Sequence, residues 1–175
     1  GVVTSRSGDI TNLGALSAGS ATGDVSIIGD RITSAGTTNI KTTGAVVAEP
    51  KSATFTSFSL VGFNVNAVAS SIRLAKVADT TSTMDVGGSL AANGPISIYG
   101  GNINLNSTVT TTANTGDVLL RGVDINGAYG ISLATGRTLT LDHSGSSSIL
   151  SGIISGVDAN LVKQGAGAMY LRGVN

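Results

Sequence analysis

The stretch TGDVSIIGDRIT, residues 22–33, returns as TGDVLLRGVDIN at residues 115–126, 93 positions later. Six of the twelve positions are identical, namely the opening Thr-Gly-Asp-Val, a later Gly and an Ile. A third copy, GPISIYGGNIN at residues 94–104, aligns with the second copy without a gap at an offset of 22. The spacing of 93 then corresponds to about four repeat units. A period of roughly 20–25 residues is typical of proteins built from stacked coils.

Alternating side chains identify the secondary structure of the repeat. In ISIYGGNINLNSTV, residues 96–109, the apolar positions are 96, 98, 103, 105 and 109. A period of two predicts short strands, and the change of parity at Gly100-Gly101 predicts a corner, where glycine adopts backbone angles closed to other residues. The same pattern recurs in TLTLDHSG and FNVNAV, and the scattered Gly and β-branched residues disfavour helix.

Short strands of regular spacing would also suit an antiparallel sandwich. Asn-Gly pairs at 93–94 and 126–127 could form hairpins, but most breaks in the pattern lack such a turn. In a parallel β-helix, like residues one coil apart stack directly on each other, and a sandwich gains nothing from such a period. We therefore predict an all-β parallel β-helix, a β-solenoid, for residues 1–175. At about 4.8 Å per coil, seven or eight coils would form a rod about 35–40 Å long.

Two stretches depart from the period. Residues 46–57, VVAEPKSATFTS, contain the single Glu and one of two prolines, and residues 78–84, ADTTSTM, form a second break. We predict that residues 46–57 leave the coil as a loop or form an irregular coil, and that residues 78–84 form a second loop. Phe55, Phe58 and Phe63 are expected to fill the core where the coils do not match.

The composition excludes several classes of protein. Hydrophobic residues make up 41% of the chain, which is enough for a core, although charged residues are only 11%. Ten basic residues balance ten acidic ones without a patch of either sign, so nucleic acid is not an expected partner. The absence of Cys excludes disulfides and thiolate metal sites. No apolar run approaches the roughly 20 residues of a membrane span, and no leader opens the sequence, so we expect a mature form or a segment of a longer protein.

The last fifteen residues read LVKQGAGAMYLRGVN. They resemble the autotransporter-associated β-strand repeat, whose pattern is L-x-K-x-G-x-G-x-L-x-L-x-G-x-N. The matching positions are Leu161, Lys163, Gly165, Gly167, Leu171, Gly173 and Asn175, with Met169 in place of a Leu. The preceding ILSGIISGVDA is similar to the segment that often leads into this repeat, so we assign residues 149–175 to it.

The GDV-x-I-x-G copies resemble, more diffusely, the filamentous haemagglutinin-like passengers of Gram-negative bacteria. The resemblance implies a right-handed parallel β-helix that is secreted by a type V route and displayed outside the cell. In that family the β-strand repeat is usually followed by more chain and eventually by a membrane barrel.

Acidic residues are the first candidates for a site, because polysaccharide-cleaving β-helices use paired carboxylates. Asp9, Asp24 and Asp117 each follow a glycine, and the last two are equivalent positions in two copies. Hydrogen bonds from nearby amides to the carboxylate explain Gly-Asp at a corner, so we predict a turn role, with catalysis and ion binding as alternatives. Asp124 and Asn126, in GVDINGAYG, are weakly similar to a calcium loop but lack its other ligands.

His143 is the only histidine and lies between Asp142 and Ser144 in LDHSGSSS. Members of a catalytic triad meet in space and are rarely neighbours in sequence, so we predict a solvated histidine in a turn. Gly165 and Gly167 do not form a nucleotide-binding loop, because no helix follows them.

Three asparagines, Asn102, Asn104 and Asn106, alternate on one face. They would form a side-chain ladder or face water, and we favour water. The run STVTTTANT, residues 107–115, would suit an ice-binding surface only if Thr recurred in register on several coils, which the sequence does not show. We predict no catalytic residue, no cofactor and no metal site.

A solenoid exposes strand edges at its ends, and these edges invite further pairing. We therefore expect end-to-end contact with further coils or other copies. The predicted function is an extracellular, non-catalytic structural and adhesive segment of a bacterial surface or secreted exoprotein, with host or cell-surface glycans as possible partners and no membrane insertion of this segment. The alternatives are a self-assembling filament subunit and a glycan-active β-helix enzyme.

Overall fold

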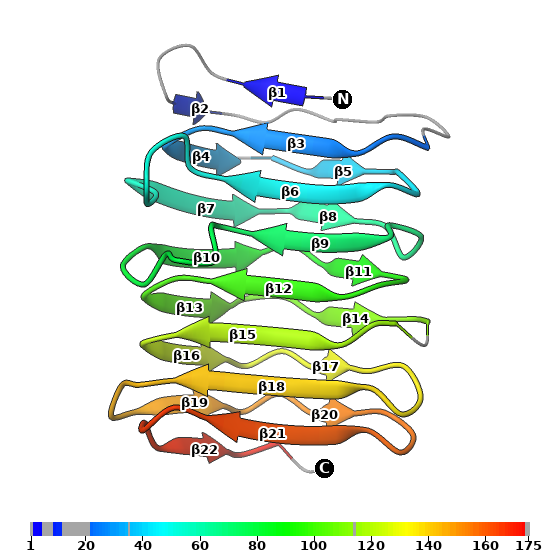
Figure 1. Ribbon diagram of the computed structural model, residues 1–175, viewed down its shortest axis with the longest axis vertical. Helices are drawn as coiled ribbons and strands as arrows, with labels where there is room; N and C mark the ends of the chain where they lie inside the picture. Colours follow the sequence, from blue (N-terminus) through cyan, green and yellow to red (C-terminus); the bar gives the residue numbers. More distant parts are fainter. Residues whose placement is uncertain (1, 5–8, 12–21, 35, 114, 174–175) are drawn as a thin grey trace.

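The computed structural model describes residues 2–4, 9–11, 22–34, 36–113 and 115–173. These residues contain strands and no helix. The strands stack as a β-solenoid of about seven turns with about 22 residues per coil. In Figure 1 the strands of the front sheet run to the left and those of the rear sheet return to the right as the chain descends, which is a right-handed winding. The predicted fold class is confirmed.

Three sheets form the walls of the solenoid, and every strand pairing recorded in them is parallel. Sheet A contains β1 (Val2–Thr4), β3 (Val25–Ile28), β6 (Ala45–Glu49), β9 (Ser71–Leu74), β12 (Ile96–Tyr99), β15 (Val118–Gly122), β18 (Thr138–His143) and β21 (Asn160–Gln164). Sheet B contains β2 (Asp9–Thr11), β4 (Arg31–Ser34), β7 (Ser57–Val61), β10 (Thr83–Gly87), β13 (Asn102–Leu105), β16 (Asp124–Gly127), β19 (Ser148–Leu150) and β22 (Met169–Leu171). Sheet C contains β5 (Thr38–Ile40), β8 (Phe63–Val65), β11 (Leu90–Ala92), β14 (Val109–Thr111), β17 (Ile131–Ser132) and β20 (Ile154–Ser155).

The register explains why the two similar stretches lie 93 residues apart. Val25 and Val118 occupy the same column of sheet A, and the column passes through Val46, Ile72 and Ile96. The four coil steps between them are 21, 26, 24 and 22 residues long. Ile96 pairs with Val118, as the gap-free alignment predicted. The asparagine of one Asn-Gly pair, Asn126, lies inside parallel β16, so that pair forms no hairpin.

Inward-facing side chains form continuous columns along the axis. Burial alternates along nearly every strand, and equivalent inward positions of successive coils are in register. Removing each large apolar side chain from water contributes roughly 1.5–3 kcal/mol. The column through the centre of sheet A includes Ile27, Ala48, Leu74, Ile98, Leu120 and Leu141, all at most 1% exposed.

Aromatic side chains fill the core beside the long coils. Phe58 and Phe63 are 2% and 0% exposed, and Phe55 is 7% exposed. The rings of Phe55 and Phe58 lie 4.8 Å apart between centroids. The predicted role of the three phenylalanines in the core is confirmed.

The two longest coil steps carry their extra residues at the corner between sheets A and B. Residues 50–56 connect β6 to β7, and residues 75–82 connect β9 to β10. The predicted excursion at 46–57 therefore begins too early, because residues 46–49 keep the strand alternation and belong to β6. The predicted excursion at 78–84 is displaced. The observed loop begins at Ala75, directly after β9, and residues 83 and 84 already belong to β10.

Hydrogen bonds hold the first loop against Asp30 and the second loop against the first. The Asp30 carboxylate accepts hydrogen bonds from the backbone N–H of Ser52 at 2.6 Å and from its hydroxyl at 2.9 Å. The amide of Ser52 lowers the pKa of Asp30 by stabilising the charged form. Lys76 of the second loop donates to the carbonyl oxygens of Lys51 at 3.2 Å and Ser52 in the first.

The glycine pair lies at the predicted corner, between β12 and β13. The reason why glycine is required there differs from the predicted one. Gly100 and Gly101 are not among the residues with positive φ. A Cβ at Gly101 would lie 2.9 Å from the carbonyl carbon of Thr81, and one at Gly100 would lie 2.6 Å from Cγ of Met84. Close approach of the preceding coil, and not a left-handed backbone, therefore requires glycine here.

Candidate functional site

The corner aspartates bond the next coil. Oδ1 of Asp24 accepts a hydrogen bond from the backbone N–H of Ala45 at 2.8 Å, and Oδ1 of Asp117 accepts one from Thr138 at 2.9 Å. Both acceptors bond an amide 21 residues ahead, so the two copies of Gly-Asp make the same contact. Each carboxylate therefore joins two coils, whereas the sequence predicted bonds to amides nearby in the same turn. The side chain of Asp9 lies outside the described residues.

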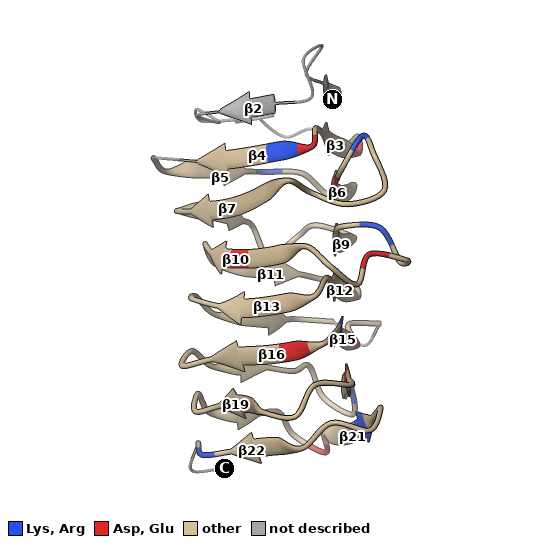
Figure 2. Ribbon diagram, turned by 90° about the vertical axis from the view of Figure 1, so that its left-hand side faces the viewer, with Lys and Arg blue, Asp and Glu red and all other residues tan. Residues whose placement is uncertain are grey.

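Sheet B presents a flat polar surface to solvent. One outward column runs through Thr33, Ser59, Asp85, Asn104 and Asn126, and we call it the sheet B polar face. Asn104 donates to Oδ1 of Asp85 at 2.7 Å. Figure 2 shows few charged positions on the strands of this side, namely a basic one on β4 and single acidic ones on β10 and β16.

The other two asparagines of the predicted row, Asn102 and Asn106, are exposed, as favoured from the sequence. The central one, Asn104, belongs to a side-chain ladder as well, so both alternatives occur in one row.

Two hollows flank Asp85 on the polar face. The larger, about 420 Å³, is lined by Ser59, Val61, Gly87 and Asn106 beside the aspartate. The smaller, about 250 Å³, is lined mainly by hydroxyl side chains and two phenylalanines: Phe55, Thr56, Ser57, Phe58, Thr81, Ser82 and Thr83. Hydroxyl, amide and carboxylate groups at this density can bond the hydroxyl groups of a saccharide.

A second polar ladder crosses four coils on the outside of sheet C. Asn64 donates to Oδ1 of Asn39 at 3.2 Å, and its own Oδ1 accepts from the amide of Ser89 at 3.0 Å. The Ser89 hydroxyl lies 3.1 Å from that of Thr108. This ladder was not predictable from local sequence, because its members occupy four different local patterns.

His143 is buried, contrary to the predicted solvated turn. It is 1% exposed and occupies the inward phase of β18 together with Leu139 and Leu141. Its Nδ1 lies 3.3 Å from the hydroxyl of Ser148, which accepts the amide of Ile125 at 2.9 Å. The Nε2 atom of His143 has no hydrogen-bond partner among the described residues.

Burial lowers the pKa of His143, and the charge of Lys163 acts in the same direction. Asp124 and Asp142 oppose this shift without reversing it. Ser148 is 0% exposed, so the contact between serine and histidine is out of reach of a substrate. The alternation in TLTLDH places His143 on the same face as Leu139 and Leu141, which predicts burial. The polar residues that follow it suggested a turn instead.

The residues that are weakly similar to a calcium loop lie in β16. Oδ1 of Asn126 accepts the amide of Ile149 at 3.1 Å, which occupies it in bonding the next coil. Oδ1 of Asp124 is buried and has no hydrogen-bond partner in the described part of the chain. Within that part, no cluster of three His, Asp or Glu side chains is placed to hold a metal.

Two ion pairs were not predicted from the sequence. Glu49 and Arg73, one coil apart, form an ion pair of 2.8 Å, and Arg121 bonds Asp142 at 2.7 Å. The spacings of 24 and 21 residues between the partners were the available signal.

The buried Asp79 was also missed. Its carboxylate accepts the amides of Thr81 at 3.1 Å and Ser82 at 3.0 Å, and the hydroxyl of Ser82 at 2.5 Å. This Asp-x-Thr-Ser turn closes the loop of residues 75–82 on itself.

Two other sequence features have structural explanations. Gly165 has a φ of +73°, and a Cβ there would lie 2.2 Å from the carbonyl oxygen of His143, so the Gly-Ala-Gly stretch is a corner. Thr110 of the Thr-rich run has Ala91 and Ser132 as register partners, so no rank of threonines forms.

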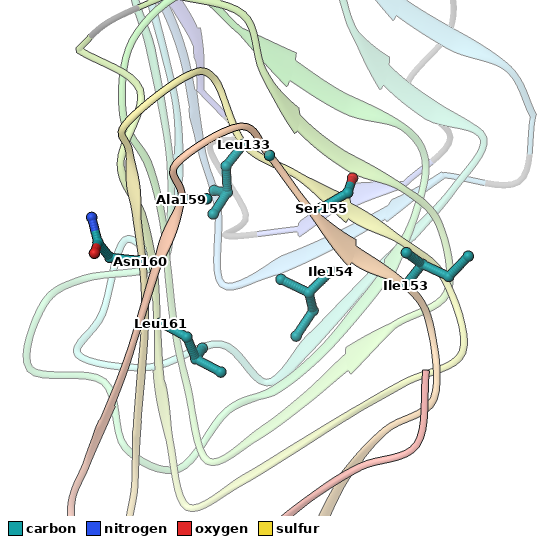
Figure 3. Close-up of a pocket in the computed structure, with 8 residues that line it drawn as sticks. Leu133, Ile153, Ile154, Ser155, Ala159, Asn160 and Leu161 are labelled. Carbon is teal, nitrogen blue, oxygen red and sulfur yellow. The ribbon is translucent and has the colours of Figure 1, made fainter. Parts of the chain in front are cut away.

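The last coil leaves apolar side chains open at the C-terminal end of the rod. Ile153, Leu161 and Leu171 are 57%, 47% and 38% exposed. Two of them, Ile153 and Leu161, line a hollow of about 420 Å³ together with Leu133, Ile154, Ser155, Gly156, Ala159 and Asn160. In Figure 3 Ile154 and Leu161 point into the interior of the coil, whereas Asn160 points away from it. We call this surface the C-terminal end face.

No protein-family model, curated protein or solved structure matches the chain. The described residues include no helix of the length and hydropathy required to cross a membrane. The assignment of residues 149–175 to an autotransporter-type repeat stays a prediction from the residues themselves.

Proposed function

We propose that the chain is a non-catalytic structural and adhesive segment of a bacterial exoprotein that acts outside the cell. The observation that carries the proposal is the use of polar side chains to join coils. Asp24, Asp117 and Asn126 each bond a backbone amide on the next coil. Bonds of this kind, added to three parallel sheets, favour a stiff rod with flat walls.

The adhesive half of the proposal rests on the sheet B polar face. Its hydroxyl, amide and carboxylate groups border two hollows, and the chain has no net charge. Neutral polar surfaces suit glycans better than nucleic acid, whose binding depends on clustered Lys and Arg. We expect cell-surface polysaccharide to lie along the axis of the rod across successive strands.

The arrangement of carboxylates on this sheet supports binding over catalysis. Asp85 and Asp124 lie on β10 and β16, with β13 between them, and in different columns. Two strand spacings place their backbones about 10 Å or more apart. Glycosidases hold their two carboxyl groups about 5–9.5 Å apart.

Retention on a panel of immobilised bacterial and host polysaccharides tests the proposal. The double variant Asp85→Ala/Asn104→Ala removes both members of one side-chain bond, and Thr140→Ala/Val162→Ala on the outside of sheet A is the matched control. We expect the first variant to lose about tenfold or more in affinity and the control to retain it. Absence of retention on every polysaccharide would contradict the adhesive half, and release of reducing ends would favour an enzyme.

A further inference from the structure

We infer that a hollow on the outside of sheet C binds the carboxylate of an acidic sugar, a uronate unit of a polysaccharide. The hollow measures about 170 Å³, and its polar lining consists of Asn39, Lys41, Asn64, Asn66 and Ser89. We call it the sheet C hollow. The inference rests on the proposed function only for the kind of ligand, a glycan, because that proposal places adhesion on the sheet B polar face.

The first argument is the register, which sets four polar side chains around one space. Asn39 pairs with Asn64, on strands β5 and β8 that lie one below the other in Figure 1. The N–H of Asn66 donates to the carbonyl oxygen of Ile40 at 3.1 Å, so the pairing continues and Lys41 lies beside Asn66. All four polar residues are exposed or half-buried between inward neighbours. One strand spacing of about 4.8 Å and two residues of about 3.3 Å each enclose a space the size of a sugar ring.

The second argument is that backbone contacts fix the orientation of the side-chain amides. The backbone N–H of Thr42 donates to Oδ1 of Asn66 at 3.3 Å, so the NH₂ group occupies the other position. In the described part of the chain no group accepts a hydrogen bond from this NH₂ group. Asn66 therefore offers two N–H donors to a ligand.

The amide of Asn39 is fixed in the same way, through Asn64. The oxygen of Asn64 accepts the backbone N–H of Ser89 at 3.0 Å, and its NH₂ group donates to the carbonyl oxygen of Gly62 at 3.3 Å. The same NH₂ group donates to Asn39 at 3.2 Å, so the atom of Asn39 that receives it is the oxygen. The NH₂ group of Asn39 has no acceptor among the described residues and is also left for a ligand.

The third argument is the charge of the hollow. Lys41 is exposed, and neither ion pair between described residues includes it. The residues that line the hollow include no Asp or Glu, whereas both hollows of the sheet B polar face contain Asp85. The unused side-chain groups are therefore donors, namely two amides and one ammonium. A carboxylate is their complement, because its two oxygens only accept hydrogen bonds and the ammonium contact is assisted by charge.

The surroundings favour a sugar as the carrier of the carboxylate. A single lysine matches one negative charge, whereas nucleic acid requires clustered Lys and Arg. One coil further on, the hydroxyls of Ser89 and Thr108 lie 3.1 Å apart and can bond the hydroxyl groups of a sugar. Because β11 pairs with β8, the small side chain of Ala91 lies beside Asn66 and leaves room for a ring.

Calorimetric titration with oligomers of galacturonate, mannuronate and glucuronate tests the ligand class, with the methyl ester of each as its matched probe. The ester keeps the sugar backbone and removes the negative charge. We expect at least one uronate to bind and its ester to bind about tenfold or more weakly. Binding of no uronate, or equal binding of uronate and ester, overturns the inference. Dextran sulfate and inorganic phosphate test other anions, and binding of either as tight as that of the uronate also overturns it.

Two variants locate the site on sheet C. Lys41→Met removes the charge and keeps an unbranched side chain. Asn66→Asp keeps the oxygen that accepts from Thr42 and replaces the free NH₂ group with an acceptor. We expect each variant to lower uronate affinity about tenfold or more, with an unchanged unfolding transition.

Matched controls make the same chemical changes elsewhere. Lys51→Met lies in the loop between β6 and β7, and Asn102→Asp lies at the start of β13, where both side chains are exposed. We expect both controls to retain uronate affinity. Equal weakening by the controls and by the sheet C variants overturns the inference.

The variant Asp85→Ala/Asn104→Ala separates this inference from the proposed function. It should bind uronate as the wild type does, since it leaves sheet C intact. Loss of uronate binding in this variant would assign the carboxylate to sheet B, which overturns the inference and leaves adhesion standing. Lys41→Met should keep its retention on any neutral polysaccharide that the wild type binds, so failure of one site is distinguishable from failure of the other.

Discussion

Truncation of Leu120 tests whether stacked columns stabilise the rod. Leu120 is 0% exposed and lies in register between Ile98 of the preceding coil and Leu141 of the next. Leu→Ala substitutions in cores cost about 2.7–5 kcal/mol, and the cost rises with the cavity that remains. Backbone pairing on both sides holds the neighbouring coils apart, so the cavity cannot close. We therefore expect Leu120→Ala to lower the free energy of unfolding by about 4 kcal/mol.

Urea unfolding followed by circular dichroism measures the loss. Leu119→Ala is the matched control, because it truncates the same residue type at the next position of the same strand, where the side chain faces outward and is only partly buried. We expect the control to cost about 1.5 kcal/mol or less. Equal losses for the two variants would refute the assignment of inward and outward faces.

A double-mutant cycle separates stacking from burial alone. Ile98→Ala removes the direct neighbour of Leu120 in the column, whereas Ile32→Ala removes an equally buried residue on β4, several coils away. Coupling of at least about 0.5 kcal/mol is expected for the adjacent pair, and less for the distant pair. If the distant pair couples as strongly as the adjacent one, column stacking is not the source of the stability.

Three other predictions concern a buried histidine and two kinds of corner residue. Burial depresses the pKa of His143, so below the ordinary value of about 6.5 the unfolded chain binds more protons than the folded chain. The contribution of His143 to stability should be full above that pH and fall as the pH drops below it. The difference in urea midpoint between wild type and His143→Leu, measured across this pH range, should show the fall. Gly136 and Gly165 have φ of +70° and +73°, but of these two only Gly165 has backbone where a Cβ would lie. Substitution by Ala should cost about 1–2 kcal/mol of unfolding free energy at Gly136 and about 1–3 kcal/mol more at Gly165. Thermal or urea unfolding measures both costs, and equal costs would contradict the clash. Asp24→Ala and Asp117→Ala should each cost about 0.5–1.5 kcal/mol, with similar values because the two bonds are equivalent; a tenfold disparity in their unfolding constants would show that the repeat is not energetically regular.

The repeat made the fold predictable, because a β-solenoid is specified by residues one coil apart. The offset of 22 between residues 94–104 and their next copy gave the observed pairing of Ile96 with Val118 and of Ile103 with Ile125. Loop boundaries were less accurate. The stretch VVAE satisfies the strand alternation, but its Glu and the following Pro suggested a loop, and Glu49 is paired with Arg73 of the next coil.

The site residues were harder to predict, since their partners lie on other coils. His143 looked solvated beside Asp142 and Ser144, yet its burial depends on the inward phase of β18 and on Ser148. Ladders such as Asn104 with Asp85 require the register of sheet B, which local sequence does not contain. For Asp24, turn chemistry predicted a bond to a nearby amide, but its carboxylate accepts the amide of Ala45 on the next coil.

The unequal coil steps have a consequence for engineering. Steps of 26 and 24 residues return the chain to the same columns as steps of 21 and 22, because the surplus leaves at the corner between sheets A and B. Closing a longer flexible loop costs only about 0.6 kcal/mol for each doubling of its length. A foreign peptide or a small domain grafted beside the exposed Ala53 would therefore project sideways while the columns keep their spacing. Each such corner is a position at which cargo can be displayed at a fixed height along the axis.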